Sequence, residues 1–230
     1  MKIGIIVPMS EEREYYLEQF ENIKRSVVGP TEVYEAQYHD FEIVIVLSGI
    51  GKVQAAMTTT LLMQEFKPDL VIMTGSAGAL SDELEIGDVV VANELVYHDA
   101  DSTQDGYKLG QLPGQPERYE TSRYYNEQLL QALTQLSVPN TTGLVVTGDM
   151  FVGKLETKQH IISNFPDALC VEMEGAAIAQ VLNNYQVPMV GIRSISDKSD
   201  MSSDMTFDHF VKFAGKNAAK IVFHFLDNLK

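Results

Sequence analysis

Residues 70–78 read LVIMTGSAG, an unbroken apolar run followed by small residues. The first four, Leu70 to Met73, leave no polar face, so the strand that they predict is covered on both sides. Residues 89–92, VVVA, repeat the pattern. Strands buried on both faces occur where helices cover both sides of a sheet. The two segments therefore predict an α/β protein.

Apolar runs alternate with helical patterns along the rest of the chain. Strands are predicted at residues 2–7, 31–37, 41–48, 69–74, 87–97, 142–150, 168–173 and 188–196, and helices at about 10–21, 51–66, 123–137, 155–164, 174–186 and 206–229. The second and third strands form a hairpin around residues 38–40. No repeat, low-complexity tract or linker interrupts the chain. We predict one domain, residues 1–230, built as a three-layer α/β structure with a mixed sheet flanked by helices.

The formal net charge is −15, which repels nucleic acid and anionic membrane surfaces. The charge favours a neutral or zwitterionic small molecule as partner, although acidity for solubility alone explains it equally well. No window approaches the ~18 apolar residues of a membrane span. Acidic residues follow the short apolar N-terminal stretch at once, unlike in a signal peptide. We expect a soluble, cytoplasmic protein.

The single cysteine, Cys170, excludes an internal disulfide and a cysteine-based zinc site. Residues 97–101, YHDAD, offer possible metal ligands, but no second histidine cluster accompanies them. We therefore expect no metal. Residues 100–120 contain several glycines and prolines and predict a long loop, which in a compact domain is usually functional or interfacial.

In folds of this class, ligands bind beyond the carboxyl ends of strands. Five predicted strand ends carry unusual residues: 9–12 (MSEE), 48–52 (SGIGK), 74–78 (TGSAG), 171–175 (VEMEG) and 193–197 (RSISD). The two glycine-rich segments lack the spacing of a P-loop, a dinucleotide fingerprint or a nucleophile elbow. Each is explained as a tight strand-to-helix turn with positive φ, or as a close approach of backbone to ligand.

The carboxylates at these strand ends are more informative. Glu12 begins a helix, where a favourable N-terminal charge is a sufficient explanation. Glu172 and Glu174, if both lie in a strand, share one face, and burying them is costly unless they are paired or used. Arg193, in an apolar strand, is a candidate partner. Asp197 ends that strand as a functional acid or as a turn residue.

In this order the segments resemble the nucleoside phosphorylase/nucleosidase superfamily, and most of all its 5′-methylthioadenosine/S-adenosylhomocysteine nucleosidases. The resemblance covers essentially the whole chain and rests on residues 1–6, 48–53, 74–78, 97–101, 110–114, 148–149, 171–174 and 195–197. It implies a nucleoside-phosphorylase-like fold and a homodimer with loop 100–116 at the interface. It also implies hydrolysis of the two thio-nucleosides to adenine and the thio-ribose without metal or cofactor.

The resemblance further implies a role for each matching residue. Glu12 is the base that activates water, which Ser76 and Arg193 help to hold. Asp197, oriented by Ser196, protonates adenine at N7. The other residues are implied to bind the substrate. The base is bound by Phe151 and the Val152 backbone, and the ribose hydroxyls are bound by Glu174 and the Met173 backbone. The 5′-thio group lies against Met9, Ile50 and Phe207.

These roles make physical sense. Adenine is a poor leaving group unless it is protonated, and a free aspartic acid, with a pKa of about 3.9, holds no proton at neutral pH. Asp197 therefore needs burial or a nearby acid such as Glu174 to raise its pKa. The transition state is a sugar cation, which carboxylates stabilise, and the same negative charge repels phosphate. Water is accordingly the expected nucleophile.

Two rival functions remain open. A phosphate-dependent nucleoside phosphorylase has the same fold, and Glu12 argues against it. A non-catalytic nucleoside-binding protein would need neither Glu12 nor Asp197. The chain departs from the family pattern at Val7-Pro8, where small residues are usual. It departs again at Asp105, where an aromatic residue is common in a loop that reaches the neighbouring subunit's 5′ pocket.

Overall fold

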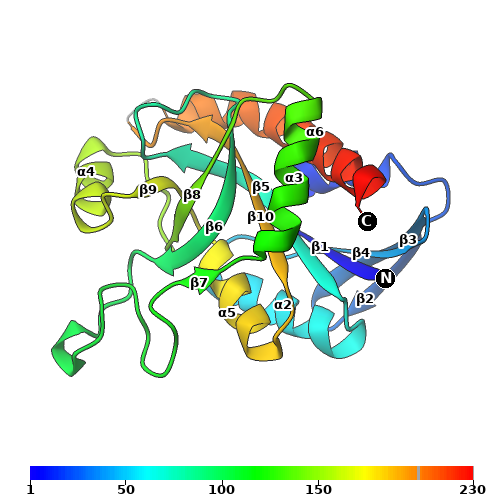
Figure 1. Ribbon diagram of the computed structural model, residues 1–230, viewed down its shortest axis with the longest axis horizontal. Helices are drawn as coiled ribbons and strands as arrows, with labels where there is room; N and C mark the ends of the chain where they lie inside the picture. The colour runs from blue at the N-terminus through cyan, green and yellow to red at the C-terminus, as the bar shows by residue number, and fades with distance from the viewer. Residues whose placement is uncertain (201–202, 230) are drawn as a thin grey trace.

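Helices cover both faces of a twisted sheet in the computed structural model, which describes residues 1–200 and 203–229 (Figure 1). One face carries α2 (Lys52–Glu65) and α5 (Gly175–Tyr185), and the other carries α1 (Ser10–Leu17), α3 (Arg123–Gln135) and α6 (Ser203–Asn228). In α6 the side chains of residues 203–209, 211 and 212 are not described. None of the described helices is long and apolar enough to cross a membrane.

The described strands form one mixed sheet. Their bounds are β1 Lys2–Val7, β2 Lys24–Val28, β3 Thr31–Tyr38, β4 Phe41–Leu47, β5 Leu70–Ala79, β6 Val89–Tyr97, β7 Tyr119–Glu120, β8 Asn140–Thr147, β9 Ala168–Glu172 and β10 Met189–Asp197. Neighbours follow the order β10-β6-β8-β9-β5-β1-β4-β3-β2, with β7 beside β6. β1 is parallel to β4 and β5, whereas the β3–β4 hairpin, predicted from the sequence, is antiparallel.

β5 is the strand on which the sheet closes. Along most of its length it pairs with β10, and its last residues, Gly78 and Ala79, pair with β9. Because β10, β6, β8 and β9 also pair in that order, these strands and β5 form a closed ring beside the open part of the sheet. The closure brings the last residues of β5, β9 and β10 together.

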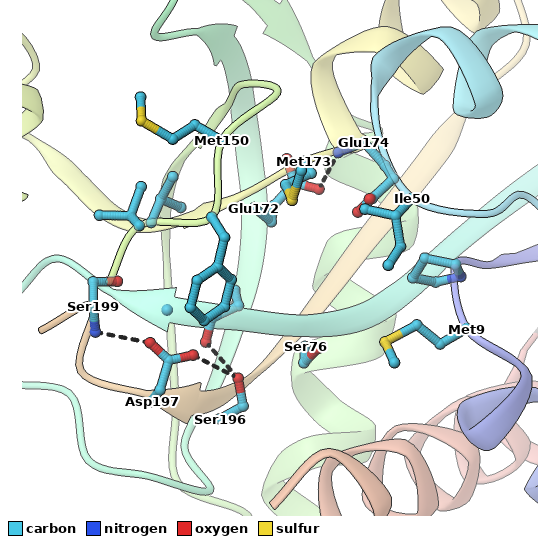
Figure 2. Close-up of a pocket in the computed structure, with 16 residues that line it drawn as sticks. Met9, Ile50, Ser76, Met150, Glu172, Met173, Glu174, Ser196, Asp197 and Ser199 are labelled. Atoms are coloured by element: carbon cyan, nitrogen blue, oxygen red, sulfur yellow. Dashed lines mark hydrogen bonds between the residues drawn. The ribbon is translucent and has the colours of Figure 1, made fainter. Parts of the chain in front are cut away.

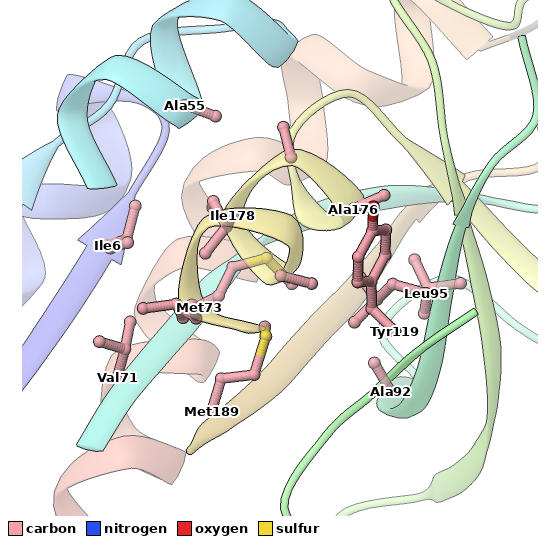
Figure 3. Packing of buried hydrophobic residues seen from close by; sticks show 14 of the residues in the cluster. Ile6, Ala55, Val71, Met73, Ala92, Leu95, Tyr119, Ala176, Ile178 and Met189 are labelled. Atoms are coloured by element: carbon pink, nitrogen blue, oxygen red, sulfur yellow. The ribbon is translucent and has the colours of Figure 1, made fainter. Parts of the chain in front are cut away.

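Each central strand contributes to two cores. In β1, Ile3 and Ile5 pack on the side of α1, α3 and α6, while Ile6 packs on the side of α2 and α5. Figure 3 shows this second core, where Ala55 of α2 and Ile178 of α5 face the strands. A third cluster joins α4 (Leu155–Asn164) to β8 and β9. The strands are therefore buried on both faces, as their unbroken apolar runs predicted.

The fold-class prediction is confirmed, and all six predicted helices and eight predicted strands form. β2 and β7 were not predicted. β2 reads KRSVV and is largely exposed at the sheet edge, and β7 has two residues, so neither carries an apolar pattern. α1 ends at Leu17 instead of near residue 21.

The strand-to-helix turn predicted at residues 74–78 is wrong. β5 continues to Ala79, and the chain then runs through a loop into β6. Gly75 is required because a Cβ at this position would lie 2.3 Å from Nη1 of Arg193 on β10. The other glycine-rich turn is confirmed, since Gly49 (φ +74°) and Gly51 (φ +94°) lead directly into α2.

We predict that Gly215→Ala destabilises the protein. A Cβ at this position of α6 would lie 2.9 Å from the Cα of Glu12 in α1, and backbone cannot yield as a flexible side chain can. The free energy of unfolding should fall by about 1–3 kcal/mol, although alanine in place of glycine normally favours a helix by up to ~1 kcal/mol. Urea unfolding measures the change. Lys216→Ala, on the exposed side of the same turn, should change it by less than about 0.5 kcal/mol. A Gly215→Ala protein as stable as the native chain would contradict the close approach of the two helices.

Candidate functional site

A cavity of about 330 Å³ opens where the strands of the closed ring end (Figure 2). Its described lining is Pro8, Met9, Ile50, Ser76, Ala77, Gly78, Met150, Phe151, Val152, Val171, Glu172, Met173, Glu174, Ser196, Asp197 and Ser199. These residues lie at or just beyond the carboxyl ends of β1, β4, β5, β8, β9 and β10. The cavity therefore lies where an α/β fold is expected to bind its ligand.

Nine predicted site residues line this cavity: Met9, Ile50, Ser76, Phe151, Val152, Met173, Glu174, Ser196 and Asp197. Glu12 and Arg193 are not in the lining but lie directly behind it. Phe207 lies in α6 among the residues whose side chains are outside the described part of the structure. Most of the predicted site residues therefore form the wall of the cavity, while Glu12 and Arg193 form a buried layer behind that wall.

Glu12 lies in the first turn of α1 and is 1% exposed. Its Oε1 accepts a hydrogen bond from the backbone N–H of Ser76 at 3.0 Å, while Oε2 has no partner among the described residues. Burial raises the pKa of Glu12 to about 7, against the opposing charge of Arg193. The carboxyl group thus has an unused acceptor beside a residue of the cavity wall and titrates near neutral pH.

Arg193 is wholly buried and pairs with two carboxylates. Its Nη2 donates to Glu172 and lies 3.5 Å from Oε2 of Glu174. Glu172 also accepts hydrogen bonds from the hydroxyl of Thr147 and the backbone N–H groups of Glu174 and Gly175. Each oxygen of Glu172 therefore has more than one donor, so this residue anchors the start of α5 and its oxygens have no unused capacity for water activation.

The condition under which Glu172 and Glu174 would share one strand face is not met. Glu172 is the last residue of β9, and Glu174 is the N-cap of α5. Oε1 of Glu174 accepts from the backbone N–H of Gly51 at 3.0 Å. Burial raises the pKa of Glu174, and the charge of Glu172 adds to the increase. The turn after β4 therefore fixes this carboxyl group at the cavity.

Asp197 ends β10 and is 3% exposed. Its Oδ2 accepts from the hydroxyl of Ser196 at 3.0 Å, and its Oδ1 accepts from the backbone N–H of Ser199 at 2.8 Å (Figure 2). The same Ser196 hydroxyl lies 3.4 Å from the backbone oxygen of Ala77. Both flanks of the carboxylate are therefore held, and the group is fixed at the end of the cavity formed by β5 and β10.

The sequence analysis considered Glu172 only as a buried acid in need of a partner, and it assigned no place in the site to Glu172 or to Pro8, Ala77, Gly78, Met150, Val171 and Ser199. Most of them are direct neighbours of predicted site residues, and that adjacency at a strand end was the available signal. Ser199 is different, because it follows Asp197 in a turn and has a φ of +54°. No pattern in the sequence predicts that its side chain is fully buried.

Residues 97–101, YHDAD, contribute Asp99 to an ion pair in the structure. Nζ of Lys52 lies 2.7 Å from each carboxylate oxygen of Asp99. His98 packs against Gly148, where a Cβ would lie 2.3 Å from Nε2 of the histidine. Within the described residues, no group of three or more His, Cys, Asp or Glu side chains is arranged to hold a metal ion.

Comparison with known proteins agrees with this geometry. The family model of the phosphorylase superfamily matches residues 2–227. A 5′-methylthioadenosine/S-adenosylhomocysteine nucleosidase from Staphylococcus carnosus is 40% identical over 227 residues, which are 99% of this chain and 100% of the relative. The chain belongs to this nucleosidase family of the phosphorylase superfamily.

Two solved structures are similar to this chain over nearly its whole length. A 5′-methylthioadenosine/S-adenosylhomocysteine nucleosidase from Streptococcus pneumoniae, with the transition-state inhibitor MT-ImmA, matches with a TM-score of 0.96 and 40% identity over the whole of both chains. A futalosine hydrolase from Helicobacter pylori matches with a TM-score of 0.96 and 35% identity, over 100% of this chain and 98% of that one. The nucleosidase is an N-glycosyl hydrolase.

The pKa of Glu12 makes a prediction about stability. Below its ordinary value of 4.5, the carboxyl group is protonated in the folded and the unfolded chain alike. Between 4.5 and about 7 the folded chain holds this proton while the unfolded chain releases it, so stability falls as the pH rises. Above about 7 both forms are ionised, and the contribution stays constant.

We expect Glu12→Gln to remove this loss of stability. The free energy of unfolding of the variant minus that of the native chain should increase by about 3 kcal/mol as the pH rises from 4.5 to 8. Urea unfolding at a series of pH values measures the difference. Glu11→Gln, on the exposed side of the same turn, is the control and should follow the native curve. Parallel curves for the native chain and Glu12→Gln would mean that Glu12 titrates as it does in the unfolded chain.

Proposed function

We propose that the enzyme hydrolyses the N-glycosidic bond of 5′-methylthioadenosine and S-adenosylhomocysteine, releasing adenine and the 5′-thio-ribose. The observation that carries this proposal is the pairing of two acids with different environments at one cavity. Asp197 lies in its lining with both oxygens held, whereas Glu12 lies behind Ser76 with one oxygen free of partners among the described residues. Two carboxyl groups at one cavity provide the two positions that a reaction with one proton donor and one proton acceptor requires.

Asp197 is the proposed proton donor to N7 of adenine. The hydroxyl of Ser196 and the N–H of Ser199 restrict its rotation, which favours directed transfer of a proton to the leaving group. Phe151 and Val152, on the loop after β8, also line the cavity and would bind the flat base. Protonation turns adenine into a good leaving group, so the C–N bond breaks as the sugar becomes cationic.

Glu12 is the proposed base that takes a proton from water. A pKa near 7 leaves a substantial share of this carboxyl ionised at neutral pH, and a group with such a pKa both accepts and later releases a proton readily. Ser76 and Arg193 would help to hold the water. Nη1 of Arg193 lies 3.5 Å from the backbone oxygen of Ser76, which brings this cation close to the proposed water site.

Glu174 and the backbone of Met173 are proposed to bind the ribose hydroxyls. Glu174 lies between the paired Arg193 and the turn at Gly51, so its carboxyl group is fixed before substrate arrives. Its negative charge beside the sugar also stabilises a cationic transition state. The apolar residues Met9 and Ile50, together with Phe207, would receive the 5′-thio group.

Water is favoured over phosphate as nucleophile by the charges around the cavity. None of its sixteen described lining residues is a lysine, arginine or histidine, and three are carboxylates. The nearby Arg193 is already paired with Glu172 and Glu174. A phosphate dianion would therefore meet negative charge and no free cation among the described lining residues, which argues against a phosphorylase.

The enzyme is proposed to act in the cytoplasm as a homodimer, in nucleoside catabolism and methionine salvage. Its one cysteine, Cys170, is buried, so the fold has no need of an oxidising compartment. A shallow groove lined by Val53, Tyr97 and Leu112 supports an interface that includes loop 100–116. Val53 is 77% exposed there, as expected for an apolar side chain that a second subunit covers.

We expect the enzyme to release adenine from 5′-methylthioadenosine at the same rate with and without phosphate. Chromatography of the products in phosphate-free buffer measures both the base and the sugar. A ribose 1-phosphate product, or turnover that stops without phosphate, would establish the phosphorylase alternative. Futalosine belongs in the substrate panel, since a hydrolase of that compound has the same fold. Faster turnover of futalosine would reassign the substrate while leaving the reaction class intact.

The two acids should respond differently to the leaving group. Asp197→Asn cannot deliver an acidic proton, so turnover of 5′-methylthioadenosine should fall by about 10²–10⁴-fold. A p-nitrophenyl riboside, whose leaving group needs no protonation, should lose much less. Glu12→Gln should slow both substrates because water must be activated in either case, yet it should preserve binding of an adenosine analogue. The assigned roles would be contradicted if Asp197→Asn slowed turnover of both substrates equally and Glu12→Gln left turnover of either substrate unchanged.

A further inference from the structure

Three loops at the cavity mouth are joined by a ring of charged contacts that the proposed mechanism does not use. The loops follow β4, β6 and β8, and the residues concerned are Lys52, which begins α2 directly after the first loop, and Asp99 and Asp149 on the other two loops. Nζ of Lys52 lies 2.7 Å from both oxygens of Asp99. Oδ2 of Asp99 accepts from the backbone N–H of Asp149 at 3.0 Å, and Oδ1 of Asp149 accepts from the backbone N–H of Lys52 at 2.8 Å. We call these three residues the loop clamp.

The clamp also completes the start of α2. The N-cap of that helix is Gly51, which has no side chain to cap the helix, and Asp149 supplies the missing acceptor from another loop. A negative charge is favourable at this end of a helix because it faces the positive end of the helix dipole. The approach is close, since a Cβ at Gly51 would lie 3.0 Å from Oδ1 of Asp149. Side-chain and backbone contacts therefore fix the two loops against each other.

Residues next to the clamp line the cavity. Gly51, adjacent to Lys52, donates its N–H to Glu174, the proposed ribose-binding acid, and Ile50 precedes it in the lining. On the other loop, Met150, Phe151 and Val152 follow Asp149 directly and line the proposed base site. Displacing either loop would change the position of groups proposed to contact the nucleoside, although no clamp residue lines the cavity itself.

Asp99 lies on the loop after β6 and contacts both other members of the clamp through its carboxylate, whereas Lys52 and Asp149 also meet directly, with Nζ of Lys52 3.8 Å from Oδ2 of Asp149. We propose that Asp99 is a positioning residue for nucleoside binding: it holds Lys52 and Asp149 so that the ribose loop and the base loop keep the spacing that the substrate requires. The inference rests on the proposed function. It assigns Asp99 a role in binding, and none in the proton transfers that Glu12 and Asp197 carry out.

The test is a comparison of KM with kcat. Asp99→Asn keeps the size of the side chain and removes its charge, so KM for 5′-methylthioadenosine should rise about fivefold to tenfold, as for the loss of one partly exposed ionic contact. The value of kcat should stay within about twofold, and the pH profile should keep its shape. Lys52→Met should raise KM by a similar factor, whereas Lys52→Arg should leave KM close to the native value. The double variant Lys52→Met/Asp99→Asn should have a KM no higher than that of either single variant.

Asp167→Asn is the matched control. It breaks an ion pair with Arg118, at 2.6 Å, in which the aspartate side chain is 52% exposed against 26% for Asp99, and neither residue lines the cavity. Asp167→Asn should leave KM unchanged even if it lowers the free energy of unfolding by as much as Asp99→Asn does. Ionic strength gives a second measurement on the folded native enzyme: KM should rise with salt in the native chain and stay nearly constant in Asp99→Asn.

Equal KM values for Asp99→Asn and Asp167→Asn, additive effects of the Lys52 and Asp99 substitutions, or a fall in kcat at unchanged KM would each overturn the role of Asp99. These outcomes are separate from the proposed function itself, which fails if the native enzyme releases no adenine from 5′-methylthioadenosine. In that case the same comparison can be made with whichever nucleoside the native enzyme cleaves, or with adenine binding measured by calorimetry.

Discussion

The buried cation of Arg193 holds the functional end of the molecule together. Its side chain extends from β10 past β5, where Gly75 leaves room for it, and meets Glu172 at the end of β9. Glu172 in turn accepts the first backbone N–H groups of α5. A buried charge without a partner costs several kcal/mol, so the cation and the acid require each other. The ring of strands and the start of α5 are consequently locked in one arrangement.

The same cation determines how the other acids behave. Glu12 and Glu174 both lie within its field, yet burial outweighs that attraction and raises both pKa values. Without Arg193 the two carboxyl groups would be protonated over a wider pH range and would serve poorly as acceptors. Its charge is already balanced by Glu172, which leaves the cavity negative overall. That balance fits a cationic sugar and an uncharged nucleophile.

Much of this organisation was accessible from the sequence. The runs at residues 70–73 and 89–92 indicated burial on both faces, and the acids at strand ends indicated where the cavity lies. The boundary between strand and helix near Glu174 was predicted to within one residue, but no local pattern indicates which distant donors Glu172 and Glu174 meet. Gly75 and Gly78 were read as part of a turn, whereas they lie inside β5, whose last residues join two different neighbours.

The sequence by itself determined the alternation of strands and helices, the mixed sheet and the set of chemically suited residues. These depend on apolar periodicity and on residue type, which are local properties of the chain. Only the tertiary structure decided which partners each acid meets and how deeply it is buried. Glu12 meets the N–H of Ser76 across 64 positions of the chain, and Glu174 meets that of Gly51 across 123. Hydrogen-bond saturation and burial arise from such distant contacts. They make Glu172 an anchor and leave Glu12 with an oxygen to spare.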